Sequence, residues 1–128
     1  LVAAIALVHV VVDVVLKPAI GRTRPAVPAA DLPVWDGRPD TPSFPSGHAA
    51  NAMAAALVLT RCWPYHGAIV WPAAVSVAVA RVYLGVHYPG DAVAGAVTGL
   101  ACGCLVLYAS SRLHPSVRAR NRTRPGGG

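Results

Sequence analysis

Apolar residues gather into four stretches of the chain, separated by segments rich in proline, glycine and charge. The stretches cover residues 1–16, 48–62, 67–84 and 91–109. A helix needs about 20 residues to cross a hydrocarbon layer of roughly 30 Å. The last stretch has nearly that length by itself, and the middle two reach it only when their polar ends are included. The pattern predicts four transmembrane helices, with a water-soluble bundle of buried helices as the alternative.

The composition of the chain also favours a lipid environment. Of the 128 residues, 55% are hydrophobic and only 12% are charged, compared with about 25% charged in an average soluble domain. The three cysteines, Cys62, Cys102 and Cys104, are too few for a disulfide framework and are expected to pack as small hydrophobic groups. Gly95, Gly99 and Gly103 recur at every fourth position, a spacing that lets membrane helices approach closely.

Charge is concentrated in two places, a long proline-rich loop over residues 17–47 and a basic tail over residues 111–128. A loop of this length is typical of a functional segment. Although the net charge of +6 could indicate nucleic acid, the tail holds much of it, so no nucleic-acid partner is expected. The tail is predicted to be disordered and cytoplasmic by the positive-inside rule, which places the loop on the extracytoplasmic side.

Three polar clusters carry the candidate chemistry. The first, Lys17, Arg22 and Arg24, could hold phosphate oxygens from several directions, or could simply anchor the chain at the membrane surface. In the second, Ser46 is a candidate helix N-cap and Gly47 permits close backbone approach, so the helix start can bind an anion beside His48. An ordinary helix cap is the alternative there.

The third cluster contains Arg81, His87 and Asp91. A carboxylate beside a histidine can hold the imidazole in one tautomer and leave the other nitrogen as a nucleophile, although such a pair could also be a simple cap. The predicted topology brings all three clusters to one membrane face. Histidines, cations and a helix N-terminus suit phosphoryl transfer, which depends on positioning and charge stabilisation. No metal cage is evident, so neither a metal nor another cofactor is expected.

The three clusters match a known set of motifs. The motifs K-x6-RP at Lys17 to Pro25, PSGH at Pro45 to His48 and R-x5-H-x3-D at Arg81 to Asp91 resemble those of the type 2 phosphatidic acid phosphatase superfamily. The resemblance implies an all-α, membrane-embedded helical bundle. Because such proteins generally have six crossings, it also implies that N-terminal helices are missing from this chain. Ala80 stands where the family usually has serine.

The resemblance further implies a role for each matching residue. His87 would attack phosphorus and form a phosphohistidine, Asp91 would orient its imidazole, and His48 would protonate the leaving oxygen. Phosphate binding would fall to the remaining motif residues, Lys17, Arg24, Ser46, Gly47 and Arg81.

Several polar residues lie outside the motifs. Arg22 is expected to be a local anchor or a substrate contact. His9 and Asp13, four residues apart on the first helix, are expected to form a structural pair inside the bundle. His66 and His114 are expected to be interfacial or solvated.

The function predicted is hydrolysis of a lipid phosphate or pyrophosphate at the outer face of a plasma membrane. Undecaprenyl pyrophosphate, phosphatidic acid and phosphatidylglycerol phosphate are candidate substrates, and the motifs do not distinguish among them or predict an oligomeric state. Two alternatives stay open. One is a vanadate-dependent haloperoxidase-like enzyme, and the other is a non-catalytic, truncated membrane module.

Overall fold

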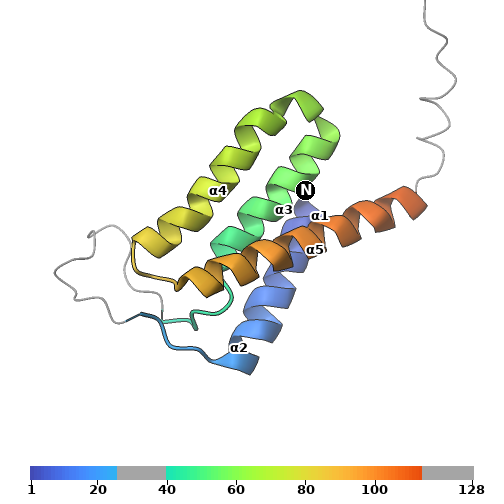
Figure 1. The fold of residues 1–128 in the computed structure, drawn as a ribbon. Helices are drawn as coiled ribbons and strands as arrows, with labels where there is room; N and C mark the ends of the chain where they lie inside the picture. Colours follow the sequence, from blue (N-terminus) through green and yellow to red (C-terminus); the bar gives the residue numbers. More distant parts are fainter. Residues whose placement is uncertain (26–39, 114–128) are drawn as a thin grey trace, which may run out of the picture.

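The structure, a computed structural model, describes residues 1–25 and 40–113, and every regular element within these ranges is helical. The elements are α1 (Val2–His9), the π-helical segment η1 (Val10–Leu16), α2 (Lys17–Ile20), α3 (Gly47–Cys62), the 3-10 turn η3 (Pro64–His66), α4 (Gly67–Tyr83) and α5 (Pro89–Leu113). Segments α1, η1 and α2 follow one another without a break, so they form one long helical rod (Figure 1).

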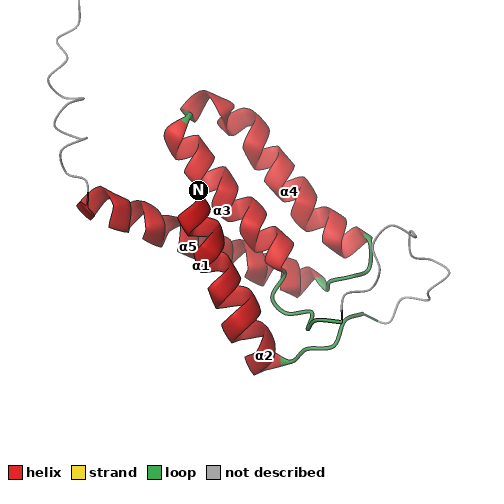
Figure 2. Cartoon of the chain, turned by 180° about the vertical axis from the view of Figure 1, so that it is seen from behind, coloured by secondary structure: helices red, strands yellow, loops and turns green. Residues whose placement is uncertain are grey.

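Helix α3 is the centre of the bundle. It runs antiparallel to α4 after the short turn at η3, while the rod of α1 to α2 and helix α5 pack against it from other sides (Figures 1 and 2). One buried cluster joins the first rod, α3 and α5, and a second joins α3 and α4. Their buried members are Val8, Val12, Ala50, Ala54 and Cys102 in the first cluster, and Met53, Ala56 and Ala74 in the second.

Among the described residues, three helical stretches are long and apolar enough to cross a membrane: Val2–Ile20, Pro64–Tyr83 and Pro89–Leu113. Large hydrophobic side chains are exposed along all three, as expected for surfaces that face lipid. The central helix α3 has 16 residues, which is short of the roughly 20 that a crossing needs. The prediction of four crossings is therefore supported for three helices, and α3 as the fourth stays a prediction.

The predicted boundaries need correction at both ends of the loop. The first helix continues past residue 16 and ends at Gly21, whose left-handed backbone (φ 60°) forms the C-cap that glycine adopts most readily. Lys17 and Gly47 are thus helical rather than part of the loop. Helix α5 extends beyond the predicted residues 91–109 at both ends, so residues 111–113 are helical. Residues 26–39 of the loop and residues 114–128 of the tail lie outside the described residues.

The glycines of α5 bring its backbone into direct contact with α3. A Cβ atom at Gly95 would lie 2.3 Å from the backbone oxygen of Ser46, and one at Gly99 would lie 2.0 Å from that of Ala50. At Gly103 the nearest atom, in the Leu57 side chain, would be 3.0 Å away. Since no real side chain tolerates the first two distances, only glycine permits this packing. The predicted close approach of small residues is confirmed.

We expect Gly99→Val to separate α3 from α5 and to lower the free energy of unfolding by about 3 kcal/mol, the upper range for overpacked sites. Thermal unfolding in detergent measures the change. Gly90→Ala is the matched control, because a Cβ atom at Gly90 meets nothing within 4 Å. In the first turn of α5 that substitution should be neutral or stabilising by up to about 1 kcal/mol. Equal melting temperatures for the two variants would contradict the close packing.

Candidate active site

A small polar cavity lies where the ends of the helices meet the loops. Its volume is about 90 Å³, which is room for several water molecules or a small anion. The lining residues are Lys17, Arg24, Thr41, Gly47, His48, Arg81, Val86 and His87. Six of the eight predicted site residues therefore surround one cavity, although they come from four separate parts of the chain. The other two, Ser46 and Asp91, are buried directly behind the lining.

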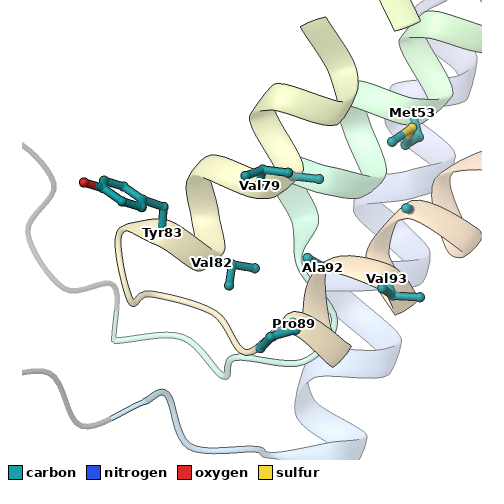
Figure 3. A pocket seen from close by; sticks show the side chains of 9 residues that line it. Met53, Val79, Val82, Tyr83, Pro89, Ala92 and Val93 are labelled. Atoms are coloured by element: carbon teal, nitrogen blue, oxygen red, sulfur yellow. The ribbon is translucent and has the colours of Figure 1, made fainter. Parts of the chain in front are cut away.

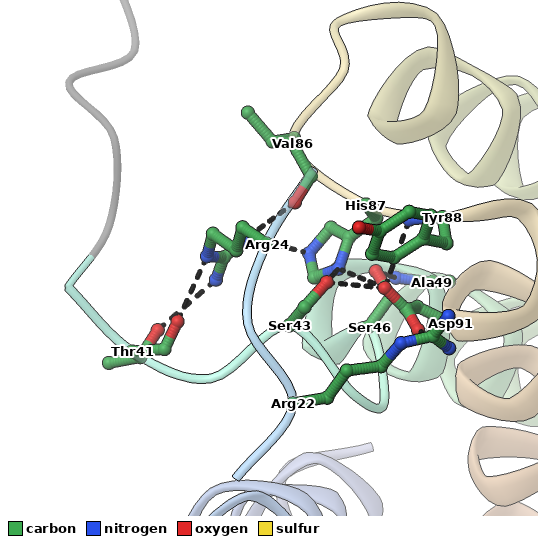
Figure 4. A network of polar contacts seen from close by, with 10 residues as sticks. All are labelled: Arg22, Arg24, Thr41, Ser43, Ser46, Ala49, Val86, His87, Tyr88 and Asp91. Atoms are coloured by element: carbon green, nitrogen blue, oxygen red, sulfur yellow. Dashed lines mark hydrogen bonds and ion pairs between the residues drawn. The ribbon is translucent and has the colours of Figure 1, made fainter. Parts of the chain in front are cut away.

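His87 is held in the turn between α4 and α5. Gly85 adopts a left-handed conformation (φ 67°), and the backbone N–H of His87 donates to the carbonyl oxygen of Arg81 at 3.2 Å. The Nε2 atom of His87 lies 3.3 Å from Nη1 of Arg24 (Figure 4). Because a guanidinium can only donate, Nε2 is the acceptor and carries no proton. The ring proton then belongs on Nδ1, which faces Oγ of Ser43 at 3.4 Å.

The environment of His87 keeps its imidazole neutral. Burial of the ring lowers the pKa of His87 below its ordinary value of 6.5, and the positive charge of Arg24 lowers this pKa further. Ser43 and Asp91 act in the opposite direction but do not reverse the shift. A histidine with a lowered pKa is unprotonated at neutral pH, and only the unprotonated form is a nucleophile.

Asp91 lies in the first turn of α5 and is completely buried. Its Oδ1 accepts a hydrogen bond from Nη1 of Arg22 at 2.9 Å, and its Oδ2 accepts from the backbone N–H of Tyr88 at 2.9 Å. Oδ2 also accepts a hydrogen bond from Oγ of Ser43. The distance from Oδ2 to Nδ1 of His87 is 3.7 Å, which exceeds a hydrogen bond. The two predicted partners are thus close, with the Ser43 hydroxyl hydrogen-bonded to both.

Of the two roles expected for Arg22, a local anchor or a substrate contact, its position fits the first. It does not line the cavity, and its guanidinium stacks 4.3 Å from the centre of the Tyr88 ring while it pairs with Asp91. The pairing of Arg22 with Asp91 was not predicted from the sequence, and neither was the position of Ser43. The sequence contained only a general indication of a partner for Asp91, because a buried carboxylate needs a cation or several hydrogen-bond donors. Several cations of the loop could have been that partner.

Arg24 joins the loop before α3 to the turn before α5. Its Nε donates to the carbonyl oxygen of Thr41 at 2.9 Å and its Nη1 to that of Val86 at 2.8 Å, while Nη2 donates to Oγ1 of Thr41 at 3.2 Å (Figure 4). These bonds hold the guanidinium beside His87. Thr41 was not foreseen from the sequence, because its contribution is largely a backbone carbonyl.

The start of α3 forms another wall of the cavity. Ser46 is the N-cap, and its Oγ accepts from the backbone N–H of Ala49 at 3.4 Å, which confirms the predicted cap. The backbone N–H of Ser46 donates to the carbonyl oxygen of Asp91 at 2.9 Å. A Cβ atom at Gly47 would lie 3.9 Å from Nζ of Lys17, so the ammonium lies beside the helix start. Helix N-termini carry a partial positive charge, and with nearby cations they favour an anion.

The fold and these motifs identify the class of protein. Residues 1–115 match the PAP2 superfamily, and the chain belongs to it, which confirms the resemblance to type 2 phosphatidic acid phosphatases. In solved structures, the chain resembles the transmembrane PAP2-type phosphatidylglycerolphosphate phosphatase of Bacillus subtilis. The TM-score is 0.70 at 30% identity, over 87% of this chain and 57% of that one. This match confirms the predicted all-α, membrane-embedded fold.

Curated relatives include lipid phosphatases of bacteria. The chain is 38% identical to the lipid A 4'-phosphatase of Bacteroides thetaiotaomicron over 77% of its own length and 47% of that protein. It is 39% identical to the decaprenylphosphoryl-5-phosphoribose phosphatase of Mycobacterium tuberculosis over 74% of its own length and 51% of that protein. The chain therefore spans about half the length of these relatives.

We expect Arg22→Gln to lower the free energy of unfolding by about 1–3 kcal/mol, because it removes a charged hydrogen-bond donor from the buried carboxylate of Asp91. Thermal unfolding in detergent tests this. Arg112→Gln is the matched control, since Arg112 also stacks on a tyrosine, Tyr108, but lies exposed near the far end of α5. Its effect should stay within about 0.5 kcal/mol. Equal effects of the two substitutions would refute the role assigned to Arg22.

Proposed function

We propose that this protein is a membrane phosphatase that hydrolyses a lipid phosphate or pyrophosphate through a phosphohistidine, without a metal ion. The observation that carries the proposal is the cavity itself, where two histidines, three cations and the start of a helix surround a space suited to a small anion. Cationic side chains and helix N–H groups supply the charge stabilisation that phosphoryl transfer requires.

In the first step, the unprotonated Nε2 of His87 attacks phosphorus and the bond from phosphorus to the leaving oxygen breaks. His48 donates a proton to that oxygen, and the imidazole of His87 becomes positively charged. The Nδ1–H of His87 is oriented by Ser43 and Asp91, and the negative charge of Asp91 stabilises the charged ring. Lys17, Arg24 and Arg81 bind the phosphate oxygens, with further donors from Ser46 and Gly47 at the start of α3.

In the second step, a water molecule attacks the phosphohistidine. His48, now unprotonated, accepts a proton from this water, the bond from phosphorus to Nε2 breaks, and inorganic phosphate leaves. His87 returns to its neutral form, which its lowered pKa favours. His48 thus acts as the acid in the first step and as the base in the second, while His87 is the nucleophile in the first step and the leaving group in the second.

An apolar groove beside the cavity supports a lipid substrate. It has a volume of about 520 Å³ and lies between α4 and α5, with Met53 of α3 also in its lining (Figure 3). Its lining is apolar and aromatic: Met53, Ala78, Val79, Val82, Tyr83, Pro89, Ala92, Val93 and Ala96. Val82 directly follows Arg81 in the chain, and Pro89 comes two residues after His87, so the same end of α4 and the junction of the turn with α5 contribute residues to both the groove and the cavity. A hydrocarbon chain in the groove would leave its phosphate near His87.

The proposed orientation places the cavity on the extracytoplasmic side. Arg112, at the C-terminal end of α5, lies at the opposite end of that helix from Asp91, and the basic residues that follow it favour the cytoplasm by the positive-inside rule.

We expect His87→Ala to abolish phosphate release from phosphatidic acid and undecaprenyl pyrophosphate, because it removes the proposed nucleophile. Released phosphate is measured in detergent, with a chelator present because no metal is required. His66→Ala is the matched control, since His66 is exposed in the turn between α3 and α4, and it should retain full activity. Equal release by His87→Ala and the unchanged protein would exclude the mechanism.

We expect Ala96→Phe, which fills the groove, to raise KM for a long-chain lipid phosphate by about tenfold while changing that for a short, water-soluble phosphate ester less than about twofold. Val97→Phe is the control, because Val97 is exposed on α5 and is not part of the groove lining. If Ala96→Phe affects both substrates equally, the groove does not hold the lipid chain.

A further inference from the structure

A second carboxylate lies close to the cavity, in the first helical rod. Oδ1 of Asp13 is 2.6 Å from Nζ of Lys17, and its Oδ2 is 2.9 Å from Nδ1 of His9. Asp13 is outside the K-x6-RP motif. The expected contact between Asp13 and His9 is present, but the His9 side chain is 67% exposed, so the pair does not lie inside the bundle. The additional contact with Lys17 connects Asp13 to a residue that lines the cavity.

The position of Asp13 sets this contact apart from an ordinary surface pair. A Cβ atom at Gly47 would lie 3.7 Å from Oδ1 of Asp13 and 3.9 Å from Nζ of Lys17. The carboxylate and the ammonium therefore both lie against the first residue of α3. The neighbouring Val12 is completely buried, and it would be equally close to that Cβ atom, at 3.7 Å. The rod is thus fixed against α3 at the point from which Lys17 reaches the cavity.

An unrestrained lysine is poorly suited to hold a phosphate in one orientation. Its ammonium is a point charge on a flexible stem of four carbons, and ordering that stem costs rotamer entropy. The side chain of Lys17 is only 13% exposed and its ammonium contacts a carboxylate. One acceptor occupies one N–H of the ammonium and leaves the other donors for a phosphate oxygen.

Asp13 also balances positive charge around the cavity. Lys17, Arg24 and Arg81 all line the same small space, where their like charges repel one another. A carboxylate bound to one of the three cations reduces this repulsion when no phosphate is present.

We propose that Asp13 is a positioning residue for Lys17, which orders the ammonium at the start of α3 so that it can bind the phosphate of the substrate. This inference rests on the proposed function, because it assigns Asp13 to the same phosphate site. It adds a residue that the three motifs do not contain.

The test is a double-mutant cycle with Asp13→Asn, Lys17→Met and the combination of both. We expect Asp13→Asn to lower kcat/KM for phosphatidic acid by about tenfold, mainly through KM. In the Lys17→Met background, the same substitution should change kcat/KM by less than about twofold, because its effect requires the lysine. An equal loss in both backgrounds would show a merely structural role and overturn the inference.

His9→Gln is the matched control for Asp13→Asn. It removes the other partner of the same carboxylate, but the His9 side chain is 67% exposed and does not line the cavity. This variant should keep kcat/KM within about twofold of the unchanged protein. A loss as large as that of Asp13→Asn would mean that the His9 pair, rather than Lys17, carries the effect.

A binding measurement separates this inference from the proposed function. Vanadate, a phosphate mimic, should raise the melting temperature of the unchanged protein and raise that of Asp13→Asn clearly less. If the unchanged protein hydrolyses no lipid phosphate but shows this difference, the proposed function fails and the role of Asp13 stands. If the unchanged protein is active and Asp13→Asn matches it in both turnover and vanadate binding, the role of Asp13 fails.

Discussion

The backbone contact between α3 and α5 is the constraint on which the site depends. Gly95 and Gly99 allow the two helices to touch, and this contact brings the N-terminus of α3 against the first turns of α5. The hydrogen bond from Ser46 N–H to the carbonyl oxygen of Asp91 joins the two helices there. The helix start that could bind an anion and the carboxylate behind His87 are consequently held in a fixed relation. A larger residue at Gly95 or Gly99 would displace the start of α3 relative to Asp91.

The charges of the site are arranged in two layers. Cations and histidines line the cavity. Two carboxylates lie behind this lining: Asp91 is next to His87, and Asp13 is next to Lys17. Asp91 is fully buried, and its donors come from both sides of the loop and from the turn before α5. Satisfying this one buried charge orders segments that have no regular structure of their own. The loops around the cavity are therefore held in place through this carboxylate.

Most of the candidate site could be predicted from the sequence, because three short motifs contained all eight proposed residues. Six of them line the cavity, and the other two lie directly behind it. Ser43, Thr41 and the partnership of Arg22 with Asp91 were missed. Thr41 acts mainly through its backbone, and nothing in the local pattern distinguishes Ser43 from an ordinary loop serine. The helix ends were less accurate, since the first helix continues to Ile20 and ends only at the left-handed Gly21.

The sequence by itself determined the helices, the small-residue spacing of α5 and the chemical groups of the site, because hydrophobic runs, glycine spacing and motif residues are local properties of the chain. Only the tertiary structure decided which arginine of the loop contacts which residue of the site. Arg22 and Arg24 are two residues apart, yet Arg22 pairs with the buried Asp91, whereas Arg24 hydrogen-bonds to His87 at the cavity. The physical reason is that ion pairing depends on distances between atoms, and Arg22 and Asp91 are 69 positions apart in the chain. Such a distance is set by how the helices pack.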